Sequence, residues 1–242
     1  VPRQTLWVLF EEVGLCTALG ATGTAGAAAW ALIVGRGWLI YEMTDSALLI
    51  GVVTFAAMIP RVAITPFTGY LSDRFERKTV LALMFGASAA QNLILAALVA
   101  FGLVEVWHLI ALSFVDGSAR AAQMPAGQAL LPNLVPRSLI LNAIALNQAA
   151  ANGSRMLGPA AIAPLLTITD GFNAGSAFFV CSGFYTASVV LTLRIKTAST
   201  GNIDPKLGIT RNIIEGLMYV YRTPLLRVIM LLALFHCGLT MS

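Results

Sequence analysis

Charged side chains are scarce in this sequence. Asp, Glu, Lys and Arg together make up 11% of the residues, whereas hydrophobic residues make up 58%. Ordinary soluble domains carry roughly 25% charged residues, because they must cover their surface with polar groups. The shortage therefore argues against a soluble protein and indicates a membrane protein. We attribute the net charge of +4 to loops on one side of a membrane, and we expect no nucleic-acid partner.

Cysteine and histidine are also rare. The chain has three Cys and two His, and Cys16, Cys181 and Cys237 lie in apolar runs without metal-ligand spacing. We interpret the three cysteines as packing residues, and we expect neither a disulfide framework nor a metal site. His108 and His236 are far apart, and the sequence contains no H-E-x-x-H, G-x-S-x-G or G-K-[ST] string. We therefore expect the chain to be no enzyme and to hold no cofactor.

Long apolar runs take the place of charge. Residues 79–104 contain no Asp, Glu, Lys or Arg, and the run exceeds the ~20 residues with which a helix crosses a bilayer core. Apolar windows separated by turn signals predict an all-α membrane protein with six complete spans and the start of a seventh. The approximate bounds of these spans are 15–40, 46–68, 79–103, 107–128, 140–167, 173–193, and 226 to the end.

These spans suggest three regions: an N-terminal six-helix transmembrane bundle, a cytoplasmic connector, and a truncated seventh transmembrane helix. Their predicted bounds are 1–193, 194–225 and 226–242. The connector has an amphipathic helical pattern that we expect Pro224 to end. Because the sequence begins at Val1 and its last apolar run is short for a span, we expect a fragment of a longer protein whose C-terminal half is missing.

The loop charges separate onto two sides. One set of alternate loops contains Arg and Lys, namely Arg74, Arg77, Lys78, Arg137 and the basic residues of 194–227. The other set contains only acidic residues: Glu42, Asp45, Glu105 and Asp170. Because Lys and Arg are retained on the cytoplasmic side during insertion, we expect a multi-pass protein with a cytoplasmic N-terminus.

A short charged segment lies between the second and third predicted spans. It reads G-Y-L-S-D-R-F-E-R-K-T-V from Gly69 to Val80, with five charges between Asp73 and Lys78. We expect a tight turn at one membrane surface. Six positions match the pattern G-x-L-x-D-R-x-x-R-[RK], namely Gly69, Leu71, Asp73, Arg74, Arg77 and Lys78. This pattern joins helices 2 and 3 of major facilitator superfamily (MFS) transporters, which the chain resembles, although Glu76 stands where many members have Gly or Asn.

Other stretches extend the resemblance from about residue 5 to the end. Residues 38–48 and 127–147 look like the bacterial siderophore- and macrolide-efflux branch, which is enterobactin-exporter-like and of the transmembrane secretion effector type. Gly158 and Pro159 resemble the Gly-Pro motif of exporters, although Ala163 replaces a final Gly. The resemblance implies twelve helices in two halves, each half built from 3+3 inverted repeats. It also implies the bacterial inner (plasma) membrane as the location.

Asp116 and Arg120 are the first candidates for a mechanism. They lie four residues apart on one predicted helix and hence on one face, and Asp116 is the sole carboxylate well inside a predicted span. One interpretation is a proton-binding site whose affinity Arg120 sets. The other is a static ion pair. Arg120 and Gln123 also resemble the R-x-x-Q part of a motif in proton-coupled exporters, although Met124 and Pro125 depart from its continuation.

Three further arginines lie inside predicted spans. We expect Arg36 to extend to the lipid headgroups at the outer end of the first span. Arg61 either lines a cavity or reaches the cytoplasmic surface. Arg155 either contacts an anionic substrate or pairs with a carboxylate of the missing half. The resulting net positive charge favours acidic or catecholate-like cargo. Uncharged polar residues at membrane depth either form interhelical hydrogen bonds or line a cavity; they are Gln91, Asn92, Asn147, Gln148 and Asn152.

The resemblance also implies roles and partners. Asp73 would hold a contact between the two halves that closes the cytoplasmic side, whereas the alternative is that the 69–78 segment only anchors the topology. The implied function is secondary active efflux of a lipophilic or siderophore-like small molecule by alternating access, with the proton as a candidate coupling ion. The partners would be the lipid bilayer, the small-molecule substrate and the missing half. The alternatives are a non-transporting or channel-like scaffold and an MFS uptake carrier.

Overall fold

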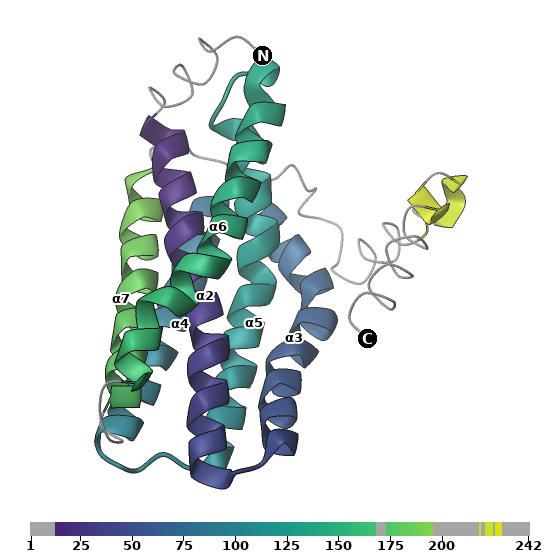
Figure 1. The fold of residues 1–242 in the computed structure, drawn as a ribbon. Helices are drawn as coiled ribbons and strands as arrows, with labels where there is room; N and C mark the ends of the chain where they lie inside the picture. Colours follow the sequence, from purple (N-terminus) through teal and green to yellow (C-terminus); the bar gives the residue numbers. More distant parts are fainter. Residues whose placement is uncertain (1–12, 168–172, 196–217, 219–220, 225, 229–242) are drawn as a thin grey trace. The chain divides into compact units, whose positions relative to one another are not determined.

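The computed structural model describes residues 13–167, 173–195, 218, 221–224 and 226–228. For residues 13, 62–63, 65–74, 166–167 and 173–174 it describes the backbone without the side chains. The chain divides into two compact units, residues 1–201 and 202–242. The described part of the first unit is helical (Figure 1). Its long helices are α2 (Val13–Thr44), α3 (Ala47–Arg74), α4 (Arg77–Ala100), α5 (Val106–Leu130), α6 (Ile140–Thr167) and α7 (Asn173–Arg194).

The helices are joined by short connections. Asp45 and Ser46 separate α2 from α3, and Asp45 adopts a positive φ of 51° that reverses the chain. Between α4 and α5, Gly102 has a φ of 68°, a conformation that glycine adopts without steric cost. Two 3₁₀ turns, Leu131–Asn133 and Arg137–Leu139, lead from α5 to α6. Such short connections bring consecutive helices back in opposite directions.

Three helices in the described part are long and apolar enough to cross a membrane. They comprise Gly14–Thr44, Arg77–Ala100 and Gly175–Arg194, and Ala47–Arg61 forms a shorter apolar stretch. A helix satisfies its own backbone hydrogen bonds, so it can lie in lipid where no water is available. Large apolar side chains such as Leu48, Phe55 and Leu141 accordingly point outward.

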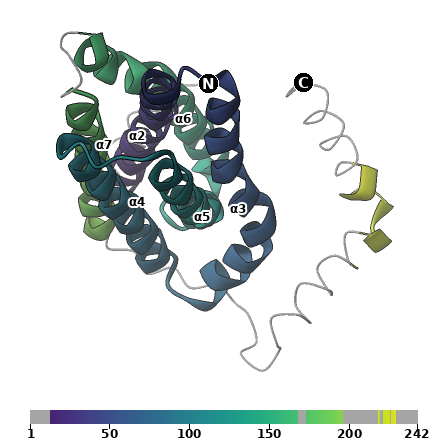
Figure 2. The same ribbon diagram turned by 90° about the horizontal axis from the view of Figure 1, so that it is seen from below.

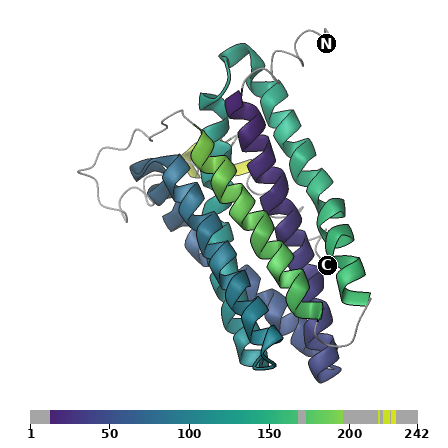
Figure 3. The same ribbon diagram turned by 90° about the vertical axis from the view of Figure 1, so that its left-hand side faces the viewer.

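Two helices form the centres of the packing in the first unit. The helix α2 packs between α6 and α7, whereas α5 packs between α3 and α4, and α4 also packs along α7 (Figures 2 and 3). The buried core comes from these contacts and includes Leu32, Leu95, Leu109, Phe178 and Tyr185. The arrangement leaves α2 and α5 facing each other with few direct backbone contacts.

Two glycines set the closest helix approaches. A Cβ at Gly117 of α5 would collide with the carbonyl group of Ala57 in α3. A Cβ at Gly158 of α6 would collide in the same way with the carbonyl group of Ala27 in α2. In lipid, helices associate through close packing, so a missing side chain at the crossing point brings the two backbones together.

The observed helices agree with most of the predicted span bounds, but α3 is longer than expected. The prediction of a tight turn over 69–78 is wrong for its first part, because α3 continues to Arg74 and only Phe75 and Glu76 separate it from α4. Continuing the helix satisfies the backbone, whereas charged side chains near a membrane surface are solvated by headgroups and water. A run of charges therefore does not require a break in the helix.

The predicted connector and seventh helix lie mostly outside the described residues. In the second unit, Thr223 is non-helical between helical Arg222 and Pro224. The backbone N–H of Arg227 donates to the carbonyl oxygen of Thr223 at 3.1 Å, which begins the next helical turn.

Candidate functional site

Arg36 lies at the centre of a buried polar network. Its side chain belongs to α2, and the residue is only 5% exposed. The Nη1 group donates to Ser113 Oγ of α5 at 3.2 Å, and the Nη2 group donates to Gln91 Oε1 of α4 at 3.0 Å. The prediction that Arg36 extends to the headgroups is therefore wrong: the side chain turns inward, because α4 and α5 offer it acceptors.

Asp116 of α5 is the acidic member of the network. The residue is 1% exposed, and its Oδ2 atom lies 3.5 Å from Arg36 Nη1 and 3.9 Å from Arg120 Nη1. Its Oδ1 atom accepts a hydrogen bond from Gln91 Nε2 at 3.3 Å. The i, i+4 approach of Asp116 and Arg120 agrees with the sequence prediction. The shorter contact, however, is the one to Arg36, which spacing on a single helix could not reveal.

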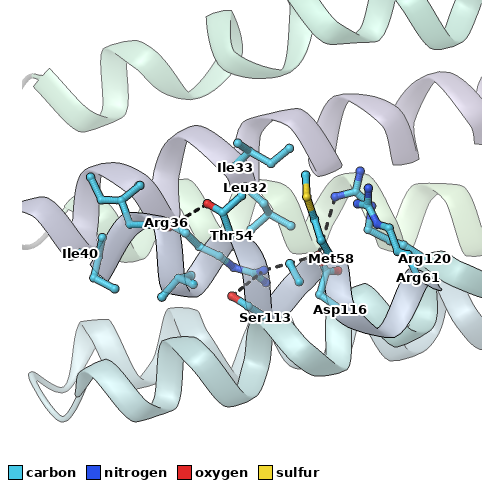
Figure 4. Close-up of a pocket in the computed structure, with 14 residues that line it drawn as sticks. Leu32, Ile33, Arg36, Ile40, Thr54, Met58, Arg61, Ser113, Asp116 and Arg120 are labelled. Carbon is cyan, nitrogen blue, oxygen red and sulfur yellow. Dashed lines mark hydrogen bonds and ion pairs between the residues drawn. The ribbon is translucent and has the colours of Figure 1, made fainter. Parts of the chain in front are cut away.

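A cavity of about 60 Å³ adjoins this network between α2, α3 and α5 (Figure 4). Arg36 enters from α2, and Asp116 lies between it and the neighbouring side chains of Arg61 and Arg120 (Figure 4). Arg61 thus lines the cavity, which was one of its two predicted locations. Apolar residues complete the wall, including Leu32, Ile33, Ile40, Val53 and Met58.

Gln123 takes part in a different contact from Arg120. Its Nε2 group donates to Ser88 Oγ at 2.9 Å and to the carbonyl oxygen of Met84 at 3.1 Å, and both acceptors belong to α4. The two polar residues of the R-x-x-Q string therefore point in different directions. Arg120 faces the cavity, whereas Gln123 fastens α5 to α4.

Two predicted site residues of α6 lie outside the network. The side chain of Arg155 is exposed, and its guanidinium carbon lies 5.0 Å from the ring centroid of Trp30 in α2, a cation–π arrangement. Gln148 is also exposed. Neither residue lines the cavity beside Asp116. Gly158 of the Gly-Pro motif is buried at the α2–α6 crossing, and Pro159 is half-buried next to it.

The basic residues of the 69–78 segment contact two helix ends. Arg77 Nη1 donates to the carbonyl oxygen of Ala129 near the end of α5 at 2.9 Å, and Lys78 Nζ donates to that of Ile195 just after α7 at 2.8 Å. Cations are favoured there because the last carbonyl groups of a helix carry partial negative charge. Gly69, Leu71, Asp73 and Arg74 belong to α3, but their side chains lie outside the described residues.

Sequence reasoning missed Ser113 and the role of Arg36. Ser113 lies three residues before Asp116 and so shares its helix face, a signal that could have placed it beside the carboxylate. Gln91 was expected to form interhelical hydrogen bonds or to line a cavity, and it forms the hydrogen bonds. Among the residues that the structure describes, no group of three His, Cys, Asp or Glu side chains could hold a metal ion.

The arrangement joins α2 to α5 through an ion pair, and the uncharged Gln91 links both of them to α4. A carboxylate that two guanidinium groups share can exchange partners, accept a proton or yield its position to another anion. Ionised side chains at membrane depth are costly, and they normally mark a pathway for a substrate, an ion or a proton. Long apolar helices packed around such charges define a helical integral membrane protein with a polar interior site.

Comparison with known proteins identifies the family to which the chain belongs. Residues 7–241 match the family model described as transmembrane secretion effector. The chain therefore belongs to the transmembrane secretion effector family of MFS transporters.

Curated relatives lie in the same superfamily. An uncharacterized MFS-type transporter, YfiS of Bacillus subtilis (strain 168), is 27% identical over 221 residues, which cover 89% of this chain and 51% of the relative. The multidrug efflux pump Tap of Mycolicibacterium fortuitum is 26% identical, with 92% of this chain and 56% of the relative covered. The staphyloferrin A transporter of Staphylococcus aureus is 23% identical, with 68% and 41% covered. The chain thus spans about half the length of the curated relatives it matches.

Proposed function

We propose that this chain forms part of a secondary active transporter that exports a lipophilic or siderophore-like small molecule by alternating access. The observation that carries the proposal is the buried Arg36–Asp116–Arg120 network beside a cavity between α2, α3 and α5. A protein that only scaffolds a membrane needs no such charges in its interior, where each of them costs free energy.

In this proposal all six helices α2 to α7 cross the bilayer. The shortest of them, α7, has 22 residues, and a rise of 1.5 Å per residue gives it a length of about 33 Å, enough for the hydrocarbon core. The N-terminus and the turn at Phe75 and Glu76 would face the cytoplasm, because Arg and Lys gather in the loops on that side. The membrane would be the bacterial inner membrane.

The helix packing supports an internal repeat. Exchanging α2, α3 and α4 with α5, α6 and α7 converts the α2–α6 and α2–α7 contacts into the α5–α3 and α5–α4 contacts, which are both present. The same exchange relates the glycine crossing at Gly158 to the one at Gly117. We propose 3+3 inverted repeats within this bundle, with a second six-helix half completing the carrier as in the longer relatives.

We extend the proposal to gating at the cytoplasmic side. Because Arg77 and Lys78 fasten the start of α4 to the ends of α5 and α7, that end of the bundle is suited to moving as one body. Asp73, at the end of α3, would hold the contact to the second half that breaks when the two halves rock. Arg155, Gln148 and the Gly158–Pro159 pair lie on α6, where they would face the central pathway or the second half.

The relatives support the direction and the cargo. Besides the multidrug efflux pump and the staphyloferrin A transporter, a macrolide efflux protein A of Streptococcus pyogenes is 27% identical, with 69% of this chain and 39% of the relative covered. Two of these three relatives are named for efflux, and their names give drugs, macrolides and staphyloferrin A as cargo. We infer cargo of comparable chemistry for this chain.

Proton coupling through Asp116 is tested in the full-length protein reconstituted in vesicles. We expect Asp116→Asn to abolish proton movement driven by the substrate, because an amide cannot carry a proton across. The matched control is Glu42→Gln, which changes an exposed carboxylate next to the α2–α3 connection and should leave coupling intact. Unaltered coupling in Asp116→Asn excludes this residue as the proton carrier, and the absence of carrier-mediated flux in the unmodified protein overturns the proposed function itself.

A further inference from the structure

The cavity between α2, α3 and α5 contains more positive than negative groups. Three arginines line it, Arg36, Arg61 and Arg120, and Asp116 is the carboxylate among the lining residues. The guanidinium of Arg61 lies within electrostatic range of both Arg120 and Asp116. Like charges in an apolar interior repel strongly, so a second negative group in this cavity would be stabilised by its walls.

The ion pairs that Asp116 forms with Arg36 and Arg120 are long. Arg36 Nη1 and Arg120 Nη1 both approach the same oxygen, Asp116 Oδ2, at 3.5 and 3.9 Å. Charge-assisted N–H···O⁻ bonds are usually about 2.7–2.9 Å long. Asp116 therefore lies between Arg36 of α2 and Arg120 of α5, and it forms a tight bidentate ion pair with neither of them.

One hydrogen-bond donor of Arg36 is not used. Its Nε–H group is buried and has no hydrogen-bond partner among the described residues, although the two terminal nitrogens bind Ser113, Gln91 and Asp116. A guanidinium presents its donors in a planar fork that matches a carboxylate. A buried donor without a partner costs free energy, and an anion in the cavity could accept from it.

We propose that this cavity binds one small monovalent anion, and that Asp116 competes with this anion for Arg36 and Arg120. A cavity of about 60 Å³ has room for a carboxylate or a halide ion but not for a complete siderophore or macrolide. The anion is therefore either a free ion or the acidic head group of the cargo. The second source rests on the proposed function, whereas binding of the anion itself does not.

The competition predicts what removal of the Asp116 charge does. Without the carboxylate, Arg36 and Arg120 lose the anion that they share, so an external anion should bind more tightly.

The test is calorimetric titration of the purified chain in lipid nanodiscs with sodium acetate, sodium benzoate and sodium chloride. Titration of the same salts into empty nanodiscs serves as the blank. We expect saturable binding. Asp116→Asn should bind about 10-fold more tightly than the unmodified chain, because the carboxylate that competes for the two arginines is gone.

Two arginine variants complete the test. Arg36→Gln should weaken anion binding about 10-fold, whereas Arg137→Gln, which changes an exposed arginine between α5 and α6 and outside the cavity, should leave it unchanged. If circular dichroism shows that Arg36→Gln does not fold, the proposal is judged by the anion affinity of Asp116→Asn alone. Acetate and benzoate binding without chloride binding assigns the site to a cargo head group, and equal chloride binding assigns it to a free ion.

The proposal is overturned if neither the unmodified chain nor Asp116→Asn binds any of the three anions saturably. It is also overturned if Arg137→Gln weakens binding as much as Arg36→Gln does, because the attraction is then not local to the cavity. Carrier-mediated flux without anion binding refutes the site alone, and anion binding without flux refutes the proposed transport alone.

Discussion

One carboxylate serving two arginines explains why the residues of the network depend on one another. Asp116 is held by Arg36, Arg120 and Gln91, and the Arg36 side chain in turn depends on Gln91 and Ser113. Removing one partner of a buried ion pair leaves an uncompensated charge, which costs far more than the pair contributes to stability when intact. Single substitutions in this network should therefore be severe.

We predict that Arg36→Met destabilises the bundle by about 3–5 kcal/mol, because Asp116 then keeps only the longer contact to Arg120 and one amide donor. The free energy of unfolding can be measured by titrating the chain in mixed micelles with sodium dodecyl sulfate. Arg137→Met is the matched control, since that arginine is exposed and should give no measurable change. A loss in Arg36→Met no larger than the control's would mean that Arg36 carries no structural ion pair.

At the scale of single residues, the sequence predicts contacts within one helix but not contacts between helices. The approach of Asp116 to Arg120 follows from the spacing of four residues. Arg36 was placed at a lipid surface because the first span was predicted to end at residue 40, whereas α2 continues to Thr44. Its partners Gln91 and Ser113 lie 55 and 77 residues away in the chain, and only the packing of α2, α4 and α5 brings them together.

Among the helices, two crossings depend on the absence of a side chain. The backbone of α5 touches that of α3 at Gly117, and the backbone of α6 touches that of α2 at Gly158. Both crossings lie between a central helix and one of its neighbours, and the crossing at Gly117 joins α5 and α3, which both line the cavity.

We predict that Gly117→Ala and Gly158→Ala each destabilise the bundle by about 1–3 kcal/mol, since the new methyl group must push a backbone carbonyl group away. Matched controls exist on the same helices. A Cβ at Gly127 of α5 or at Gly153 of α6 meets no atom within 4 Å, so alanine there should be neutral or stabilise the helix by up to ~1 kcal/mol. Equal effects at all four positions, measured by the same unfolding titration, would show that the two crossings are not tight.

Helix positions were predictable because apolar runs of this length have few alternatives. The sequence predicted 140–167 and 173–193, and the structure has Ile140–Thr167 and Asn173–Arg194. The extension of α3 to Arg74 was missed because charge was taken as the end of a helix. Only the requirement that buried backbone groups be hydrogen-bonded, and not side-chain polarity, decides where a helix in lipid must continue.

At the scale of the whole molecule, the account depends on how the chain threads the membrane. One set of alternate loops contains the Arg and Lys residues together with some acidic residues, whereas the other set contains only acidic charges. The roles proposed for the charged network and the gate depend on the orientation that this pattern predicts. In the proposed orientation the α3–α4 turn faces the cytoplasm and the α4–α5 connection faces the outside.

The most direct test of this threading is the labelling of single cysteines in intact cells with a membrane-impermeant maleimide. Cys16, Cys181 and Cys237 are first replaced by Ala, and one new cysteine is then introduced at a time. Phe75, in the α3–α4 turn, and Phe101, in the α4–α5 connection, are 52% and 77% exposed and suit the purpose. We predict that Phe101→Cys reacts in intact cells and that Phe75→Cys reacts only after the membrane is made permeable. Reaction of both from the same side would contradict the account.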